Sequence, residues 1–168
     1  MGEPELALEF GAEAELVAGA GRFARALRAA GRAPLVIGLS GDLGSGKTTW
    51  ARAMLRGLGY SGRVPSPTYT LLEQYVCDGV VVVHLDLYRL RGDEELENLG
   101  LRDVLDDPTS WTLVEWPERA TQLTRRCDLT LRFGVTGSTG RRVVVSAATP
   151  AGNEALRPVR QKVFNNDP

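Results

Sequence analysis

The sequence predicts a three-layer α/β domain whose mixed sheet has a parallel centre and antiparallel edges. Three observations support this fold. An apolar run of strand length at residues 35–39 leads through a glycine-rich loop into residues 49–55, which have a helical pattern. Asp78-Gly79 separates two β-type runs, which is a strong hairpin signal. A second pair of β-type runs flanks the glycine-rich stretch 134–140, which gives another antiparallel pair.

The loop at residues 41–49 reads Gly-Asp-Leu-Gly-Ser-Gly-Lys-Thr-Thr and fits the pattern G-x-x-x-x-G-K-[ST]. In this pattern, backbone N–H groups of the loop and of the following helix N-terminus point at the phosphates of a nucleotide. The chain has two lysines, Lys47 and Lys162, against eighteen arginines, so a chance match is rare. We therefore predict a P-loop NTPase-like domain that contacts its nucleotide through Asp42, Leu43, Gly44, Ser45, Gly46, Lys47, Thr48 and Thr49.

The other elements are read from hydrophobic spacing and turn residues. Alternating apolar residues at 6–10 predict a first strand, and the alanine-rich residues 12–30 predict a helix with one apolar face. The strands expected after the P-loop helix are 69–76, 80–87, 111–115, 128–133 and 141–147, with short helices at 93–99 and 101–105. Residues 150–168 contain three prolines and show little periodicity. We therefore divide the chain into a P-loop ATPase domain, 1–149, and a mobile tail, 150–168.

Composition bounds the class of protein. A chain of 168 residues is long enough to bury one core without a metal or a disulfide. The formal net charge of −1 argues against a global basic field that would recruit nucleic acid. Cys77 and Cys127 lack metal-type spacing, and we interpret them as reduced residues of a cytosolic protein. No signal peptide or run of membrane length is evident, so we expect a cytoplasmic protein without membrane contact.

Nucleotide hydrolysis needs a metal site and a group that places the attacking water, in addition to the P-loop. The Thr48 hydroxyl is the expected first Mg²⁺ ligand. An acidic residue must then approach from the carboxyl end of a neighbouring strand, and two strands offer one, ending in Asp86 and in Glu115. Each acid alone could be a solvent-facing strand end, but two of them in one P-loop domain favour a functional site.

Three further features have a plain structural interpretation from the residues alone. Ser66-Pro67-Thr68 could bring a hydroxyl to a γ-phosphate, as switch loops do, but an ordinary proline turn is the preferred reading. The single histidine, His84, is interpreted as a hydrogen-bonded packing residue rather than a catalyst. Trp116 follows Glu115 and would either cover the site or close the core.

Four motifs occur in order along the chain: the P-loop, Ser-Pro-Thr-Tyr-Thr-Leu at 66–71, His-Leu-Asp-Leu-Tyr-Arg-Leu at 84–90, and Val-Glu-Trp-Pro-Glu at 114–118. Together they resemble the TsaE family, formerly YjeE. Its members are small bacterial P-loop ATPases of the threonylcarbamoyladenosine tRNA-modification pathway. The resemblance covers residues 34–147. The first motif is generic to P-loop proteins, whereas the other three are specific at these spacings.

The resemblance implies ATP and Mg²⁺ as cofactors and assigns roles to individual residues. The catalytic residues that it implies are Lys47, Glu115, Asp86 and Thr68. The metal would be held by Thr48 and Glu115, with Asp86 beside them as a ligand or one shell removed. Thr68 would take a switch-like part, which overturns the proline-turn reading. Gly140 and Arg141 correspond to a region that closes over the nucleotide.

The resemblance also implies partners. TsaE-type proteins act with an assembly of TsaB- and TsaD-type proteins, which transfers threonylcarbamoyl to adenosine 37 of tRNAs that read ANN codons. The ATPase does not perform that transfer and meets tRNA only indirectly, through the assembly. Its slow hydrolysis would reset the assembly between turnovers.

Other classes of P-loop protein fit less well. A GTPase needs an Asn-Lys-x-Asp base reader, but the only other lysine, Lys162, follows Gln161. A small-molecule kinase is the main alternative, although the chain after Glu115 leaves little room for an arginine-rich lid and an acceptor pocket. A nucleotide-sensing adaptor without enzymatic activity is the third possibility.

Overall fold

The computed structural model describes residues 5–31 and 34–164 of the chain. Within these residues a seven-stranded sheet has the strand order β1-β7-β6-β2-β5-β4-β3. The strands are β1 (Leu6–Phe10), β2 (Leu35–Gly41), β3 (Leu72–Cys77), β4 (Val80–Asp86), β5 (Ser110–Glu115), β6 (Leu129–Thr136) and β7 (Gly140–Ala147). Strands β6, β2, β5 and β4 are parallel to one another, whereas β3, β7 and β1 pair antiparallel at the sides. The predicted parallel centre with antiparallel edges is confirmed.

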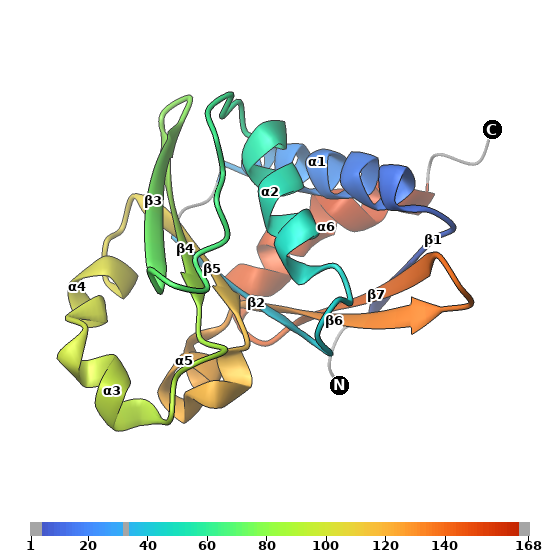
Figure 1. The fold of residues 1–168 in the computed structure, drawn as a ribbon. Coiled ribbons are helices and arrows are strands. Elements are labelled where there is room, and N and C mark those ends of the chain that lie inside the picture. Colours follow the sequence, from blue (N-terminus) through green and yellow to red (C-terminus); the bar gives the residue numbers. More distant parts are fainter. Residues whose placement is uncertain (1–4, 32–33, 165–168) are drawn as a thin grey trace.

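Helices cover both faces of the sheet, so the domain has three layers (Figure 1). The helices of one layer are α1 (Glu13–Ala29), α2 (Lys47–Gly57) and α6 (Pro150–Phe164). The helices of the other layer are α3 (Asp93–Asn98), α4 (Leu101–Leu105) and α5 (Thr121–Arg126), with the 3₁₀ turn η1 (Pro117–Arg119) before α5. In the described part of the chain no helix combines the length and apolar character needed to cross a bilayer.

The apolar core has two parts, one on each side of the sheet. Strand β5 is buried along its whole length because it lies inside the sheet, between β2 and β4, with a helical layer on each face. On the side of α2, Trp50 is fully buried and its ring lies 5.6–6.0 Å from the rings of Phe10, Phe23 and Phe133. These aromatic contacts fix α2, and with it the preceding loop, against β1, α1 and β6.

Residues 150–164, which we expected to belong to a mobile tail, form helix α6 instead. Ala155, Leu156 and Val159 are buried in the core that α6 shares with α1. The sequence pattern did not indicate this helix, because Pro158 lies inside it, where proline removes an N–H donor and normally ends a helical pattern. Residues 165–168 of the expected tail lie outside the described residues.

The hairpin signal at Asp78-Gly79 is confirmed, but the strand before it is shorter than expected. Residues 69–71, predicted as the start of a strand, form a turn, and β3 begins at Leu72. Leu71 has a φ of 65°, and its N–H donates to the carbonyl of Pro67. The turn therefore keeps the Ser66-Pro67-Thr68 segment outside the sheet, next to the carboxyl end of β4, since the Asp86 N–H donates to the Leu71 carbonyl.

Candidate nucleotide site

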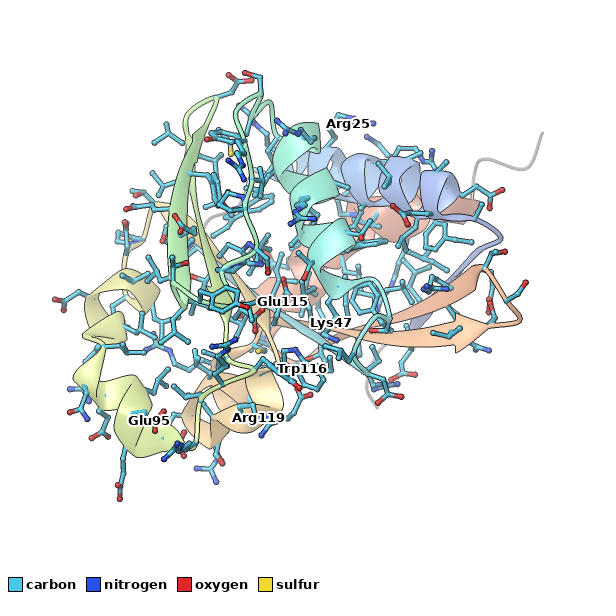
Figure 2. All side chains as sticks on the ribbon, in the orientation of Figure 1. Arg25, Lys47, Glu95, Glu115, Trp116 and Arg119 are labelled. Atoms are coloured by element: carbon cyan, nitrogen blue, oxygen red, sulfur yellow. The ribbon has the colours of Figure 1, made fainter. Side chains whose placement is uncertain are left out.

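A cavity of about 550 Å³ lies where the carboxyl ends of β4 and β5 meet the loop that follows β2. The predicted site residues that line it are Leu43, Gly44, Gly46, Lys47, Thr48, Thr49, Thr68, Asp86, Glu115 and Arg141. Figure 2 shows Lys47, Glu115 and Trp116 close together near the middle of the molecule. The structure therefore gathers residues from four separate motifs at one position, the edge of the sheet where α/β folds bind ligands.

Two glycines give the loop its shape. Gly44 has a φ of 76° and Gly46 a φ of 110°, values that residues with a side chain rarely adopt. Gly46 is the N-cap of α2 and accepts the N–H of Trp50 through its carbonyl. The first N–H groups of a helix have no acceptor within that helix, and Lys47, Thr48 and Thr49 at the start of α2 line the cavity, so this end of α2 is suited to an anion.

Lys47 is folded onto its own loop. Its Nζ donates to the carbonyls of Gly41 at 2.6 Å and Asp42 at 2.8 Å, and to the Ser45 hydroxyl at 3.4 Å. The same atom lies 4.1 Å from the centre of the Trp116 ring. Asp42 and Ser45 thus accept hydrogen bonds from Lys47 but do not line the cavity. Gly140 does not line the cavity either.

Opposing effects act on the ammonium group of Lys47, a residue that is only 4% exposed. Burial lowers the pKa of Lys47, because the charged form loses hydration. The carboxylates of Glu115, Glu118, Asp86 and Asp42 raise the same pKa. An anionic ligand such as a phosphate would add to this second effect and favour the charged lysine.

Glu115 links the P-loop helix to the middle of the sheet. Its Oε2 accepts a hydrogen bond of 2.8 Å from the Thr48 hydroxyl, and its Oε1 lies 2.8 Å from His84 Nε2. Both Glu115 and His84 are buried, at 2% and 0% exposure. His84, which we interpreted as a packing residue, therefore contacts a predicted site residue. The spacing could have shown this, because His84 lies two residues before Asp86 and shares its face of the strand.

Asp86 is held by a second, separate set of contacts. Its Oδ2 accepts a hydrogen bond of 3.0 Å from the Thr68 hydroxyl, and Ser66 Oγ lies 2.7 Å from the same hydroxyl. Its Oδ1 accepts the Tyr88 backbone N–H at 2.9 Å. The Ser66-Pro67-Thr68 loop is thus attached to the strand-end carboxylate by its hydroxyl groups, in the place where a switch-like loop is expected.

The oxygen groups at this site fit Mg²⁺. The Thr48 hydroxyl and the Glu115 carboxylate are hard oxygen ligands that lie within one hydrogen bond of each other, with Asp86 on the neighbouring strand in register with Glu115. Among residues 5–31 and 34–164, no group of three or more His, Cys, Asp or Glu gathers as a complete metal site. Mg²⁺ usually takes one or two protein carboxylates and completes its shell with phosphates and water.

Trp116 lines the cavity, and its backbone has a strained conformation. Its φ of 59° and ψ of 48° are left-handed, which is uncommon for a bulky residue and often marks a functional position. The Tyr88 ring lies 5.2 Å from the Trp116 ring, and the Arg119 guanidinium lies 5.9 Å from it. Trp116 both lines the cavity and packs against the core on the side of α3, α4 and α5, so the structure agrees with both interpretations of this residue.

Some lining residues gave no signal in the sequence. They come from the start of α1 and from the β6–β7 turn, and they are Ala12, Glu13, Leu16, Ser138 and Thr139. Arg141 anchors this side, since its guanidinium donates to the carbonyls of Gly140 at 2.9 Å and Gly44 at 3.4 Å. These segments meet the P-loop only through the strand order, so no local pattern could have placed them there.

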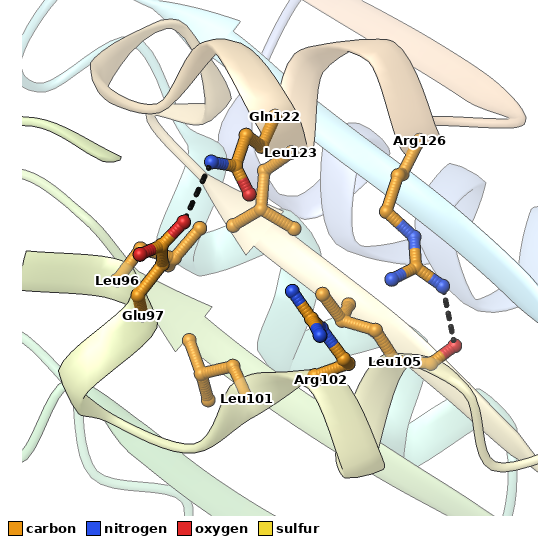
Figure 3. A pocket seen from close by; sticks show the side chains of 8 residues that line it. All are labelled: Leu96, Glu97, Leu101, Arg102, Leu105, Gln122, Leu123 and Arg126. Carbon is orange, nitrogen blue, oxygen red and sulfur yellow. Dashed lines mark hydrogen bonds between the residues drawn. The ribbon is translucent and has the colours of Figure 1, made fainter. Parts of the chain in front are cut away.

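A second cavity of about 370 Å³ lies on the opposite face of the sheet, among α3, α4 and α5 (Figure 3). Its apolar lining consists of Leu96, Leu101, Leu105 and Leu123. Gln122 donates to Glu97 at 3.3 Å, and Arg126 donates to the carbonyl of Leu105 at 3.3 Å. None of the predicted site residues lines this cavity.

Known proteins resemble this chain both in sequence and in fold. The sequence model of the family described as "Threonylcarbamoyl adenosine biosynthesis protein TsaE" matches residues 12–143. A relative from Haemophilus influenzae described as "tRNA threonylcarbamoyladenosine biosynthesis protein TsaE" is 46% identical over 95 residues, which are 56% of this chain and 60% of the relative. A relative of the same description from Streptomyces coelicolor is 43% identical over 100 residues, which are 58% of this chain and 64% of the relative. The matched segment therefore spans less than two thirds of these relatives.

The fold has a solved counterpart. The crystal structure of YdiB from Bacillus subtilis superimposes with a TM-score of 0.72, covers 96% of this chain and 98% of that chain, and is 23% identical in sequence. That likeness establishes the fold as a P-loop NTPase-like α/β domain. The family match extends over most of the domain and includes all four motifs that meet at the cavity. This chain belongs to the TsaE family.

Proposed function

We propose that this protein is a Mg²⁺-dependent ATP-binding protein with slow ATPase activity that supports the assembly of TsaB- and TsaD-type proteins. The assembly forms N6-threonylcarbamoyladenosine at position 37 of tRNAs that read ANN codons. The observation that carries the proposal is the hydrogen bond between Thr48 and Glu115, which joins the P-loop helix to an acidic strand end inside one cavity. Membership of the TsaE family supplies the pathway.

In this proposal the P-loop binds the phosphates of ATP. The N–H groups at the start of α2 would donate to phosphate oxygens, and Lys47 would leave its carbonyl partners on Gly41 and Asp42 to reach the β- and γ-phosphates. The exchange is favourable because a phosphate carries a full charge, whereas a carbonyl offers only a dipole. Lys47 thus lies close to the position in which it would contact the phosphates, and a nucleotide can replace its present hydrogen bonds.

The acidic residues would serve the metal and the water. Thr48 and Glu115 would hold Mg²⁺, which neutralises the charge that develops on the phosphates. Asp86 would stand beside them and accept a hydrogen bond from a water molecule. Trp116 and Tyr88 would exclude bulk water from this side of the cavity, since both line it and their rings lie 5.2 Å apart.

Slow hydrolysis by the protein alone is part of the proposal. Thr68 donates to Asp86 in this structure, so its hydroxyl is engaged with the protein. A partner that reorders the Ser66-Pro67-Thr68 loop would release Thr68 toward the γ-phosphate and complete the site. The partner that we propose is the TsaB–TsaD assembly, with tRNA contacted indirectly through it.

The proposal is tested by measuring ATP hydrolysis by the protein alone, with purified TsaB- and TsaD-type proteins, and with small-molecule acceptors. We expect slow hydrolysis alone, a change in rate with the two proteins, and pull-down of the assembly only in the presence of ATP. Transfer of the γ-phosphate to an added acceptor would show a kinase instead. ATP-dependent binding without any hydrolysis would show a nucleotide-sensing adaptor.

A further inference from the structure

We propose that His84 is a positioning residue, which fixes the Glu115 carboxylate in the orientation that presents Oε2 to Thr48. This inference rests on the proposed function, because its purpose is to prepare Glu115 for a metal-bound nucleotide. His84 does not line the cavity, so it would act only through Glu115.

The sheet brings the two side chains together. His84 lies on β4 and Glu115 on the neighbouring parallel strand β5, where Asp86 is paired with Glu115 and His84 with Leu113. Because side chains alternate along a strand, His84 and Asp86 point to the same face, one pleat apart. The imidazole therefore reaches Glu115 from the interior side of the site, and its Nε2 lies 2.8 Å from Oε1.

The chemistry of the contact defines its direction. A carboxylate that is to hold a metal must be ionised and can then only accept hydrogen bonds, so in the proposed arrangement His84 Nε2 donates to Glu115 Oε1. The Thr48 hydroxyl donates to the other oxygen at 2.8 Å. Two donors on different elements thus hold the two oxygens of Glu115, and the plane of the carboxylate is fixed. With Thr48 alone, the carboxylate could turn about its last bond, whose rotational preference is broad.

The surroundings of His84 argue against a role in packing alone. The side chain is 0% exposed, and its Nδ1 has no hydrogen-bond partner among the described residues. Burying a polar group without a partner destabilises the fold, and an apolar side chain of similar size would fill the same space without that cost. The contact between Nε2 and Glu115 is thus the one polar interaction found for this imidazole within the described chain, and it leads to the site.

Asp86 offers an internal comparison. Its two oxygens accept from the Thr68 hydroxyl and from the Tyr88 N–H, groups on segments outside the strands. Glu115 is instead fixed by His84 within the sheet. The arrangement assigns a rigid carboxylate to the Thr48 side of the site and a loop-dependent one to the Thr68 side.

The experiment compares His84→Leu, His84→Gln and His84→Asn in the full chain. Gln carries an amide N–H near the place of Nε2, whereas the shorter Asn carries its amide near the place of Nδ1. Mn²⁺ binding is measured by electron paramagnetic resonance with a non-hydrolysable ATP analogue, and binding of the analogue is measured separately without metal. The control is Thr112→Val, which changes another buried polar residue of β5. Thr112 is paired with Val83 and Val36, and its side chain lies on the face of the sheet away from His84.

We expect His84→Leu and His84→Asn to weaken Mn²⁺ binding about 10- to 100-fold, the usual effect of removing a group that orients a ligand. Affinity for the analogue without metal should stay at the wild-type value in both variants. His84→Gln should recover most of the Mn²⁺ affinity, because it returns a donor to Oε1. Thr112→Val should bind Mn²⁺ as the wild type does.

The inference is overturned if Gln and Asn variants of equal thermal stability bind Mn²⁺ equally, a comparison that stands even where His84→Leu does not fold. Wild-type Mn²⁺ affinity in His84→Leu would overturn it as well. Failure of the proposed function has a different signature, because the wild-type protein itself would then bind neither the analogue nor Mn²⁺ with the analogue.

Discussion

The two faces of the sheet each carry a cavity, and the two cavities differ in how they hold charge. On the side of α2, Lys47, Asp86 and Glu115 are buried, at 4%, 4% and 2% exposure. On the side of α3, α4 and α5, the floor is made of leucines, and the side chains of Arg126 and Asp106 form an ion pair while remaining 39% and 56% exposed. In the first cavity the protein itself shields the charged side chains from water.

This difference favours the first cavity as the candidate functional site over the hollow between the helices. Each buried ion costs several kcal/mol in desolvation, which its partners only partly offset, whereas an exposed ion pair contributes about 0–1 kcal/mol. A cluster of buried charges therefore persists where a ligand will use it. Shape and apolar lining alone would not distinguish the two cavities, since both are of moderate size.

Lys47→Ala is the change with the largest expected effect on this comparison. ATP affinity should fall about 10- to 100-fold and hydrolysis should be lost, since a hydrogen bond to a charged group contributes about 1.5–3 kcal/mol. The fold should stay intact, because the Lys47 ammonium donates its hydrogen bonds within its own loop and lies over the Trp116 ring rather than in the apolar core. Titration with a fluorescent ATP analogue measures the loss. Arg126→Ala at the other cavity is the control and should bind as the wild type does.

Wild-type affinity in Lys47→Ala would contradict the P-loop assignment. A loss of ATP binding in Arg126→Ala would contradict the distinction between the two cavities, because it would show that the leucine-lined cavity also affects nucleotide binding.

Glu115→Gln should have the next largest effect and should separate binding from hydrolysis. The amide keeps the shape of the side chain but removes the negative charge, so nucleotide binding should remain measurable while the rate of hydrolysis falls about 100-fold. Asp86→Asn is the matched comparison and should lose about 10-fold if Asp86 acts one shell from the metal. Phosphate release over time measures both. Equal rates in Glu115→Gln and the wild type would show that Glu115 is only a structural strand-end acid.

Thr68→Ala should have a smaller effect on the isolated protein and a clear one on the pathway. Thr68 donates to Asp86 and does not hold the P-loop, so nucleotide affinity should stay nearly unchanged. Coupling to the TsaB–TsaD assembly should be lost, which is measured as reconstituted threonylcarbamoylation of tRNA over many cycles at saturating ATP. Sustained wild-type turnover in the mutant would leave the loop as an ordinary proline turn.

The smallest predicted effect concerns the face opposite the nucleotide site, at alkaline pH. Burial raises the pKa of the Cys127 thiol from 9.0 to about 12, so the folded protein keeps the thiol neutral where the unfolded chain ionises it. The corresponding stability is complete below the unfolded pKa and is lost as the pH rises toward the folded one. At pH 10 the loss should be about 1 kcal/mol, measured by urea unfolding. Cys127→Ala should flatten this pH dependence, and an unchanged slope would contradict the assignment.

The sequence by itself determined the features that depend on neighbouring residues. The P-loop is one continuous segment, so its glycines and Lys47 specify an anion site wherever the loop is placed. The turn at Asp78-Gly79 and the alternation of apolar residues likewise determined the antiparallel hairpin and the face of each strand. The strand ends at Asp86 and Glu115 marked two acidic candidates, and the resemblance to the family added the roles of Thr68, Gly140 and Arg141.

The tertiary structure decided which of these residues meet. Two strand-end acids had equal claims from the sequence, but the strand order puts β5 next to β2, and Glu115 rather than Asp86 contacts Thr48. The same order brings His84 to Glu115 and leaves Asp86 to Thr68. Helix α6 also depends on the fold, because its apolar side is stabilised by packing against α1 in spite of Pro158. Contacts between residues distant in the chain follow from strand order and burial, which no local pattern encodes.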